Sequence, residues 1–118
     1  MTEWTIEPAK LRVAATDTML YYKNHVALSP SGTPLAAPFY RAMCRAQAYI
    51  ERLQDEGAML KATELEAWLP SQRDMHQHTV SRDSCTCEGH SLNYAYCVHM
   101  AVFDLILMVM AGANTRRV

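Results

Sequence analysis

Two short cysteine-containing motifs in the last third of the chain most constrain its fold. They are a Cys-x-Cys pair, Cys85 and Cys87, and a Cys-x-His pair, Cys97 and His99. A polar segment separates the two pairs, and an apolar run follows the second. Thiolates and one imidazole, closed into a set of four, are the ligands that a structural zinc ion takes. The sequence therefore predicts a Zn²⁺ site formed by Cys85, Cys87, Cys97 and His99.

The spacing within each pair predicts the local backbone. In an extended chain, side chains two positions apart point to the same side, so Cys85 and Cys87 can bind one ion where a strand ends. In a helix, residues two positions apart do not face each other. We therefore expect Cys97 to precede the last helix and His99 to lie at its start. Zinc would then join a hairpin to this helix in a closed site, which is typical of structural and not catalytic zinc.

Three further histidines lie close to these motifs in the sequence. His90 is an alternative fourth ligand in place of His99. His76 and His78 share one face of an expected strand and could bind a second metal ion or respond to pH. Exposed polar positions on a strand are the simpler interpretation of these two residues.

The remaining sequence predicts one α+β domain, because 118 residues suffice for one core and not for two. Turn-forming residues at Ser29–Pro34 separate this domain, residues 35–118, from an extension and linker over residues 1–34. The extension has both helix-like and strand-like spacings, with a preference for helix. Within the domain we expect a helix over 35–56, a hairpin and zinc knuckle over 65–97, and a helix over 98–112. The first helix is amphipathic, with one apolar face made of Phe39, Met43, Ala46, Ile50 and Leu53.

The last helix is apolar on nearly every side between Met100 and Met110. A helix that is hydrophobic all round must be buried all round. Burial at the centre of the domain and contact with a partner or a second copy both satisfy this requirement. The interface residues would be Phe103, Leu105, Met108 and Val109. Asp104, in the middle of the run, would need a hydrogen-bond partner or a position at an open edge.

The formal net charge of −1 gives no general argument for nucleic-acid binding. Any such contact would need a local basic patch. The candidates are Arg41, Arg45 and Arg52 on one arc of the first helix, together with Arg73 and Arg82. A solvated helix face is the simpler interpretation of the arc.

Other features restrict the compartment and the class of protein. The N-terminus lacks the basic and apolar regions of a signal peptide. The longest apolar stretch is shorter than the ~20 residues of a membrane span. We expect a cytoplasmic protein whose clustered cysteines are metal ligands and not disulfides. The sequence has no Gly-rich phosphate loop and no nucleophile motif, and its reactive residues are used in a closed metal site. We therefore expect no enzyme activity.

The segment from about residue 65 to residue 107 resembles the SWIM zinc finger, whose pattern is CxC, a variable loop, CxH and a hydrophobic helix. Trp68, Ser71 and Val80 fall where members often have a Trp, a Ser and a Val on the two preceding strands. The resemblance implies a β-hairpin, a zinc knuckle and an α-helix, packed here against the upstream amphipathic helix. It also implies the same four metal ligands.

SWIM modules are associated with DNA binding and with protein–protein contacts, including in small mobile-element and phage proteins. The resemblance thus implies a zinc-binding interaction protein, of which a phage or mobile-element regulator or inhibitor is one form, with DNA or RNA binding as the alternative. Family members often have Lys or Arg between the last Cys and His, where this chain has Val98. That difference favours a protein or nucleoprotein partner, or a homodimer, reached through the last helix.

Overall fold

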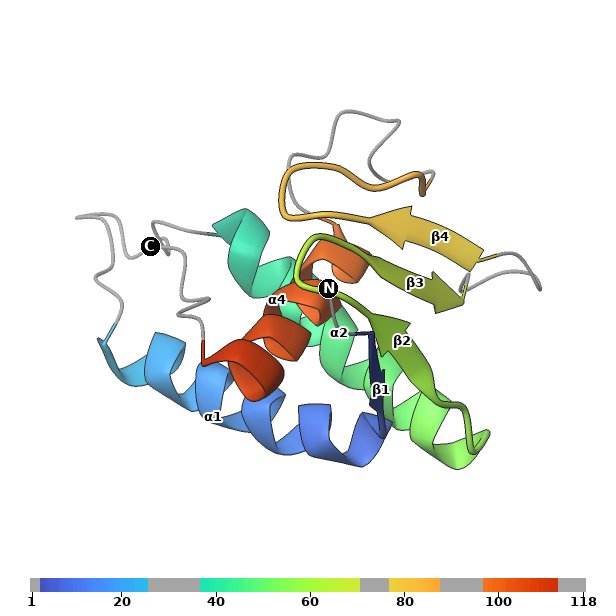
Figure 1. Cartoon of the computed structure of the whole chain (residues 1–118). Helices are drawn as coiled ribbons and strands as arrows, with labels where there is room; N and C mark the ends of the chain where they lie inside the picture. The colour runs from blue at the N-terminus through green and yellow to red at the C-terminus, as the bar shows by residue number, and fades with distance from the viewer. Residues whose placement is uncertain (1–2, 26–36, 71–76, 88–96, 113–118) are drawn as a thin grey trace.

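A computed structural model of the chain describes residues 3–25, 37–70, 77–87 and 97–112. Its described elements are arranged as four strands and three helices. The four strands form one antiparallel sheet in the order β1-β2-β3-β4. The helices lie together on one side of this sheet (Figure 1). In chain order the elements are β1 (Trp4–Ile6), α1 (Pro8–His25), α2 (Ala37–Asp55), β2 (Leu60–Ala62), β3 (Ala67–Pro70), β4 (Gln77–Val80) and α4 (Val98–Ala111). The α+β prediction is confirmed.

The sheet buries one face and exposes the other. Leu60 and Ala62 in β2 are buried, whereas Lys61 between them is exposed. Strand β3 repeats the alternation, because successive side chains of a strand point to opposite faces. The predicted hairpin is the β3–β4 pair, in which Ala67 lies opposite Val80. Strands β2 and β3 add a second hairpin on its other side.

The N-terminal segment belongs to the same core as the rest of the chain. Strand β1 pairs with β2, with Ile6 opposite Leu60. Helix α1 packs against α2 and α4, and its residues Leu11 and Ala15 are fully buried. The sequence predicts an extension and linker over residues 1–34; of that range, the described elements β1 and α1 pack with the elements that follow. The segment contains a short strand followed by a helix, so neither periodicity dominates its sequence. The Ser29–Pro34 turn segment lies outside the described residues.

Helix α2 matches the predicted amphipathic helix. Met43, Ala46, Ile50 and Leu53 are all buried on its inner face, while the side chain of Phe39 lies outside the described set. The helix ends at Asp55, and Gly57 follows with a positive φ of 70°. The N–H of Ala58 donates to the carbonyl oxygen of Leu53 at 3.0 Å, the long bond of a Schellman motif.

Helix α4 is buried mainly by its own chain. All residues from Val98 to Leu107 are buried, and Phe103 and Leu105 have no exposed surface. Their burial matches the central position that the sequence left open as the alternative to an interface, and α4 as a whole packs against α1 and α2. Met108 is half-buried, and Val109 is exposed, so the other two interface candidates remain on the surface. Within the described part of the chain, none of the helices combines the length and apolarity needed to cross a membrane.

Candidate metal centre

The hairpin and the start of α4 bring the four predicted ligands together. After Val80, the last residue of β4, a tight turn reverses the chain. The N–H of Ser81 donates to the carbonyl oxygen of Ser84 at 2.8 Å, and the N–H of Ser84 donates to Ser81 Oγ at 3.1 Å. Cys85 then pairs with Val80 in an antiparallel bridge. The turn therefore sets the position of the first ligand pair relative to the sheet.

The first ligand pair lies in an extended segment beside the end of β4. The N–H of Thr86 donates to the carbonyl oxygen of Thr79 at 3.2 Å, and the N–H of Thr79 donates to Thr86 Oγ1 at 3.2 Å. Cys85 and Cys87 are buried, whereas Thr86 between them is exposed. The two cysteines therefore share one side of the segment, as their spacing predicts.

The second ligand pair lies at the start of α4. Cys97 is the N-cap residue, with the extended backbone angles φ −102° and ψ 172°, and His99 lies in the first helical turn. The ligand atoms of Cys85, Cys87, Cys97 and His99 all lie within 4.8 Å of one another, and all four residues are buried. Ligand atoms about 2.0–2.3 Å from a tetrahedral ion are about 3.3–3.8 Å apart. The cluster is therefore close to the size that one bound metal ion requires.

The imidazole of His99 provides an independent test of whether a metal fits. The residue is 3% exposed, and neither ring nitrogen has a hydrogen-bond partner among the described residues. A buried polar atom without a partner is costly, and such atoms are uncommon in folded proteins. An ion bound by one of the two nitrogens would give that nitrogen a partner. Three sulfurs and one imidazole are therefore suitable ligands for a metal ion, and the imidazole has a buried nitrogen that such an ion would satisfy.

The cysteine thiols also perturb one another. The hydrogen bond to the Cys97 sulfur, reinforced by burial, raises the pKa of the Cys85 thiol far above its usual value. In the other direction, the hydrogen bond from Cys85 lowers the pKa of Cys97 to about 3, although burial opposes this change. The two pKa values move in opposite directions because the two sulfurs share one hydrogen bond. A bound cation would allow several of the clustered sulfurs to be thiolates together.

Aromatic side chains from two other elements pack against His99. The ring of Tyr49, on α2, lies edge-on with its centroid 5.6 Å from that of His99. The ring of His78, on β4, lies 4.9 Å away and tilted by 57°. His78 Nδ1 is 3.3 Å from Thr86 Oγ1, and the Tyr49 hydroxyl donates to the Pro70 carbonyl oxygen. These contacts connect the candidate ligand to α2, β3 and β4.

His78 therefore differs from the simple exposed strand position expected for it. The residue is half-buried and packs against the metal cluster. His78 and the buried Val80 lie two positions apart on β4, so their side chains point to the same face of the sheet. This spacing is the sequence signal for the inward orientation of His78. Tyr49 has no comparable signal, since it lies far from the cysteines in the sequence. His76 and His90, the other two histidines considered, fall outside the described residues.

An ion pair links the turn before Cys85 to helix α4, the same two segments that carry the candidate ligands. Asp104, on α4, is fully buried, and its Oδ1 lies 3.8 Å from Nε of Arg82. Arg82 lies in the turn that precedes Cys85, and its side chain is about half exposed. The carboxylate in the apolar helix therefore has the polar partner that its burial requires.

The candidate nucleic-acid residues have different surroundings in the described parts of the chain. Arg41 and Arg45 are exposed on α2. Arg52 lies over the Tyr49 ring at 5.3 Å and pairs with a glutamate, and Arg82 pairs with the buried Asp104. The fifth candidate, Arg73, lies outside these parts.

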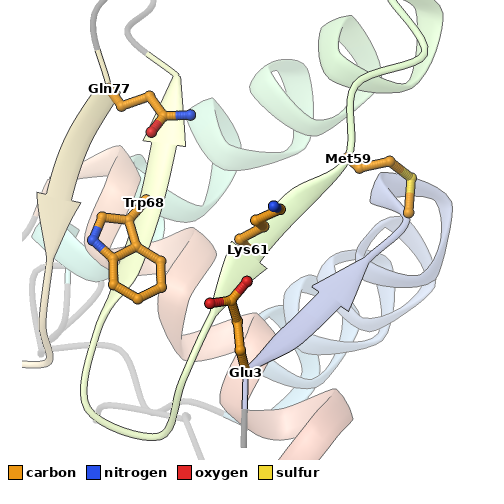
Figure 2. A pocket seen from close by; sticks show the side chains of 5 residues that line it. All are labelled: Glu3, Met59, Lys61, Trp68 and Gln77. Carbon is orange, nitrogen blue, oxygen red and sulfur yellow. The ribbon is translucent and has the colours of Figure 1, made fainter.

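An open hollow of about 380 Å³ lies on the exposed face of the sheet. Figure 2 shows its side chains in front of the strands, with the helices behind. Lys61 and Trp68, opposite each other on β2 and β3, form its centre. The hollow contains both a carboxylate and an ammonium group, so it lacks the uniformly positive lining that phosphate groups favour. Its lining residues are Glu3, Met59, Lys61, Trp68 and Gln77.

Comparisons with known proteins add no relative. The chain matches no family model, no curated protein and no solved structure. The chain is therefore described by its own fold and by its four candidate metal ligands. It is an α+β domain with a buried Cys3His cluster of metal-binding dimensions. The SWIM resemblance remains a prediction from the motif.

Proposed function

We propose that this chain is a small SWIM-like module that binds a structural zinc ion and acts by binding a protein or nucleoprotein partner, without enzymatic activity. The observation that carries the metal assignment is the closed set of four buried ligands, in which His99 has no hydrogen-bond partner within the described chain. Three sulfurs with one imidazole favour zinc over metals that prefer oxygen ligands. A reducing compartment such as the cytoplasm would keep these cysteines available as ligands.

The proposed role of zinc is structural, as a cross-link between the hairpin and α4. Cys85 and Cys87 would hold the ion from the end of the hairpin, and Cys97 and His99 would hold it from the start of α4. Four protein ligands leave no open position for a substrate or an activated water molecule. When bound, the ion would cross-link the two segments and stabilise the fold. The Ser81–Ser84 turn and the N-cap position of α4 place the ligands for it.

The end of α4 supports a protein partner. Met108 is half-buried, while Val109 and Met110 are 37% and 38% exposed. Flexible thioether side chains suit contacts with a partner of variable shape. A phage-encoded or mobile-element regulator or inhibitor is one form that such a protein could take.

Nucleic-acid binding is the weaker alternative. Arg41 and Arg45 remain available on α2, but Arg52 and Arg82 are engaged within the chain. Binding through phosphates would weaken steeply as salt increases. Binding titrations with single-stranded DNA, double-stranded DNA and RNA at two salt concentrations separate the alternatives. Tight, salt-sensitive binding that is lost in an Arg41→Ala/Arg45→Ala variant would favour nucleic acid over a protein partner.

The direct test of the metal assignment is elemental analysis of the purified protein together with native mass spectrometry. We expect one zinc ion per chain, lost in a Cys87→Ser variant and retained in Cys44→Ser. Cys44 is the matched control because it is an exposed cysteine outside the cluster. A metal-free protein that remains folded after purification in the presence of zinc would contradict the proposal.

A further inference from the structure

The metal cluster places three sulfur atoms close together just beneath the surface. Cys85, Cys87 and Cys97 are 6%, 5% and 7% exposed, whereas their neighbours Val80 and Ala101 have no exposed surface. All ligand atoms of the cluster lie within 4.8 Å of one another. A small oxidant therefore needs only slight local opening to reach a group of sulfurs that can react with each other.

Cys97 is the cysteine of the cluster at which we expect oxidation to begin. It is the N-cap residue of α4, where the unpaired N–H groups and the helix dipole stabilise negative charge. At 7% it is also the most exposed of the three sulfur residues, and oxidation follows thiolate character together with exposure. The ligand atoms of Cys85 and Cys97 lie within 4.8 Å of each other.

Backbone geometry favours Cys85 and Cys97 over Cys85 and Cys87 as a disulfide pair. The extended segment at Thr86 is held by its two hydrogen bonds to Thr79. Residues two positions apart in an extended chain have Cα atoms about 6.4–6.8 Å apart, at the upper limit of disulfide geometry. Cys97 approaches from a different element, so the same restriction does not apply to it.

We propose that the metal cluster is a peroxide-sensitive switch, in which oxidation joins Cys85 and Cys97 in a disulfide and releases the zinc ion. This inference rests on the proposed zinc site. It adds regulation to a metal whose proposed role is otherwise structural.

The reaction is balanced with hydrogen peroxide as the oxidant. The Cys97 sulfur attacks one peroxide oxygen, the O–O bond breaks, and the departing hydroxide takes a proton to become water. The resulting sulfenic acid is attacked by the Cys85 sulfur, which forms the S–S bond and releases the second oxygen as water. Two thiolates lose two electrons, peroxide gains two electrons and two protons, and zinc leaves unchanged in charge. With two ligands removed, Cys87 and His99 alone hold the ion too weakly to retain it.

The test uses the full-length, zinc-loaded protein. Its zinc content is measured first, so absence of zinc at this stage would contradict the proposed function itself. Hydrogen peroxide is then added, and released zinc is followed with a colorimetric chelator. We expect one zinc ion released per disulfide formed, and recovery of the original zinc content after thiol reduction and addition of zinc. The Cys44→Ser variant should respond identically, since Cys44 lies outside the cluster.

Peptide mapping identifies the disulfide. Cleavage after Glu88 separates Cys85 and Cys87 from Cys97, so the expected bond appears as two cross-linked peptides. Fragmentation of the cross-linked pair then shows which of the two cysteines is attached. Zinc retained while Cys44 becomes oxidised would overturn the switch and leave the zinc site intact. Zinc release accompanied only by sulfinic or sulfonic acids, or by a bond between Cys85 and Cys87, would also overturn it.

Discussion

The two ends of the sheet are stabilised by different kinds of interaction. Near β1 and β2, apolar packing dominates, with Ile6, Leu11 and Leu60 fully buried against the helices. Beyond β4, the candidate metal ligands cluster together and Arg82 pairs with the buried Asp104. We infer that the first region can stay folded on its own core, whereas the second depends on specific polar and metal contacts.

The largest effect is expected from loss of a metal ligand. Cys85→Ser should abolish stoichiometric zinc binding and lower the thermal midpoint strongly, because structural zinc contributes on the order of 10 kcal/mol of apparent binding free energy. Calorimetry and elemental analysis measure both quantities. Cys44→Ser is the control, with unchanged zinc content and midpoint. Equal midpoints for the two variants would show that the second region does not depend on metal.

A large cavity in the first region should destabilise the fold without affecting the metal. Leu11→Ala removes a fully buried side chain of α1, so we expect a loss of about 2–5 kcal/mol in the free energy of unfolding. Zinc content should remain at one ion per chain under native conditions. Val13→Ala is the matched control, because Val13 is exposed on the same helix. If denaturant titration gave equal stabilities for both variants, α1 would not belong to the core.

A smaller effect is expected from the side chain that packs on the metal-binding histidine. His78→Ala should weaken zinc affinity by up to about 10-fold, the lower end of the effect of removing a hydrogen-bonded outer partner, because His78 contacts His99 through ring packing. Competition with a zinc chelator of known affinity measures the change. His78→Phe retains a ring against His99 and separates packing from polar contacts. Unchanged affinity in His78→Ala would exclude His78 as a positioning residue.

The smallest effect is expected at the ion pair between the turn and α4. Arg82→Ala should cost about 1 kcal/mol, the upper end for a solvent-screened ion pair, because the arginine is half exposed and its Nε lies 3.8 Å from the carboxylate. Arg45→Ala, which removes an exposed arginine on α2, serves as the reference. Chemical denaturation of both variants at two salt concentrations measures the difference. A loss of unfolding free energy no greater than that in Arg45→Ala would show that the ion pair does not stabilise the fold.

The candidate ligands were predictable from sequence because their spacing has a direct geometric meaning. Cys85 and Cys87 require an extended backbone to face one ion, and Cys97 and His99 require a helix that begins between them. The amphipathic pattern of α2 likewise predicted the buried face that includes Met43 and Leu53. These features depend on local periodicity, which a single sequence contains.

Other features depend on contacts between distant parts of the chain. The short strand β1 has no distinctive pattern, and its place in the sheet follows from pairing with β2. The contact of Tyr49 with His99 joins α2 to α4, and no local spacing indicates it. The apolar sequence of α4 was compatible with an internal position and with an interface. The packing of α4 against α1 and α2, with Phe103 and Leu105 fully buried, distinguishes the two.

Amide hydrogen exchange with and without a zinc chelator tests most directly whether a metal ion joins the hairpin to α4. We predict that removal of zinc increases exchange chiefly at residues 77–87 and at the start of α4. Residues of α1 and of the β1–β2 pair should keep most of their protection at early times. Unchanged exchange at residues 77–87 in a protein shown to have lost its zinc would contradict the central claim that the metal joins the hairpin to the helix.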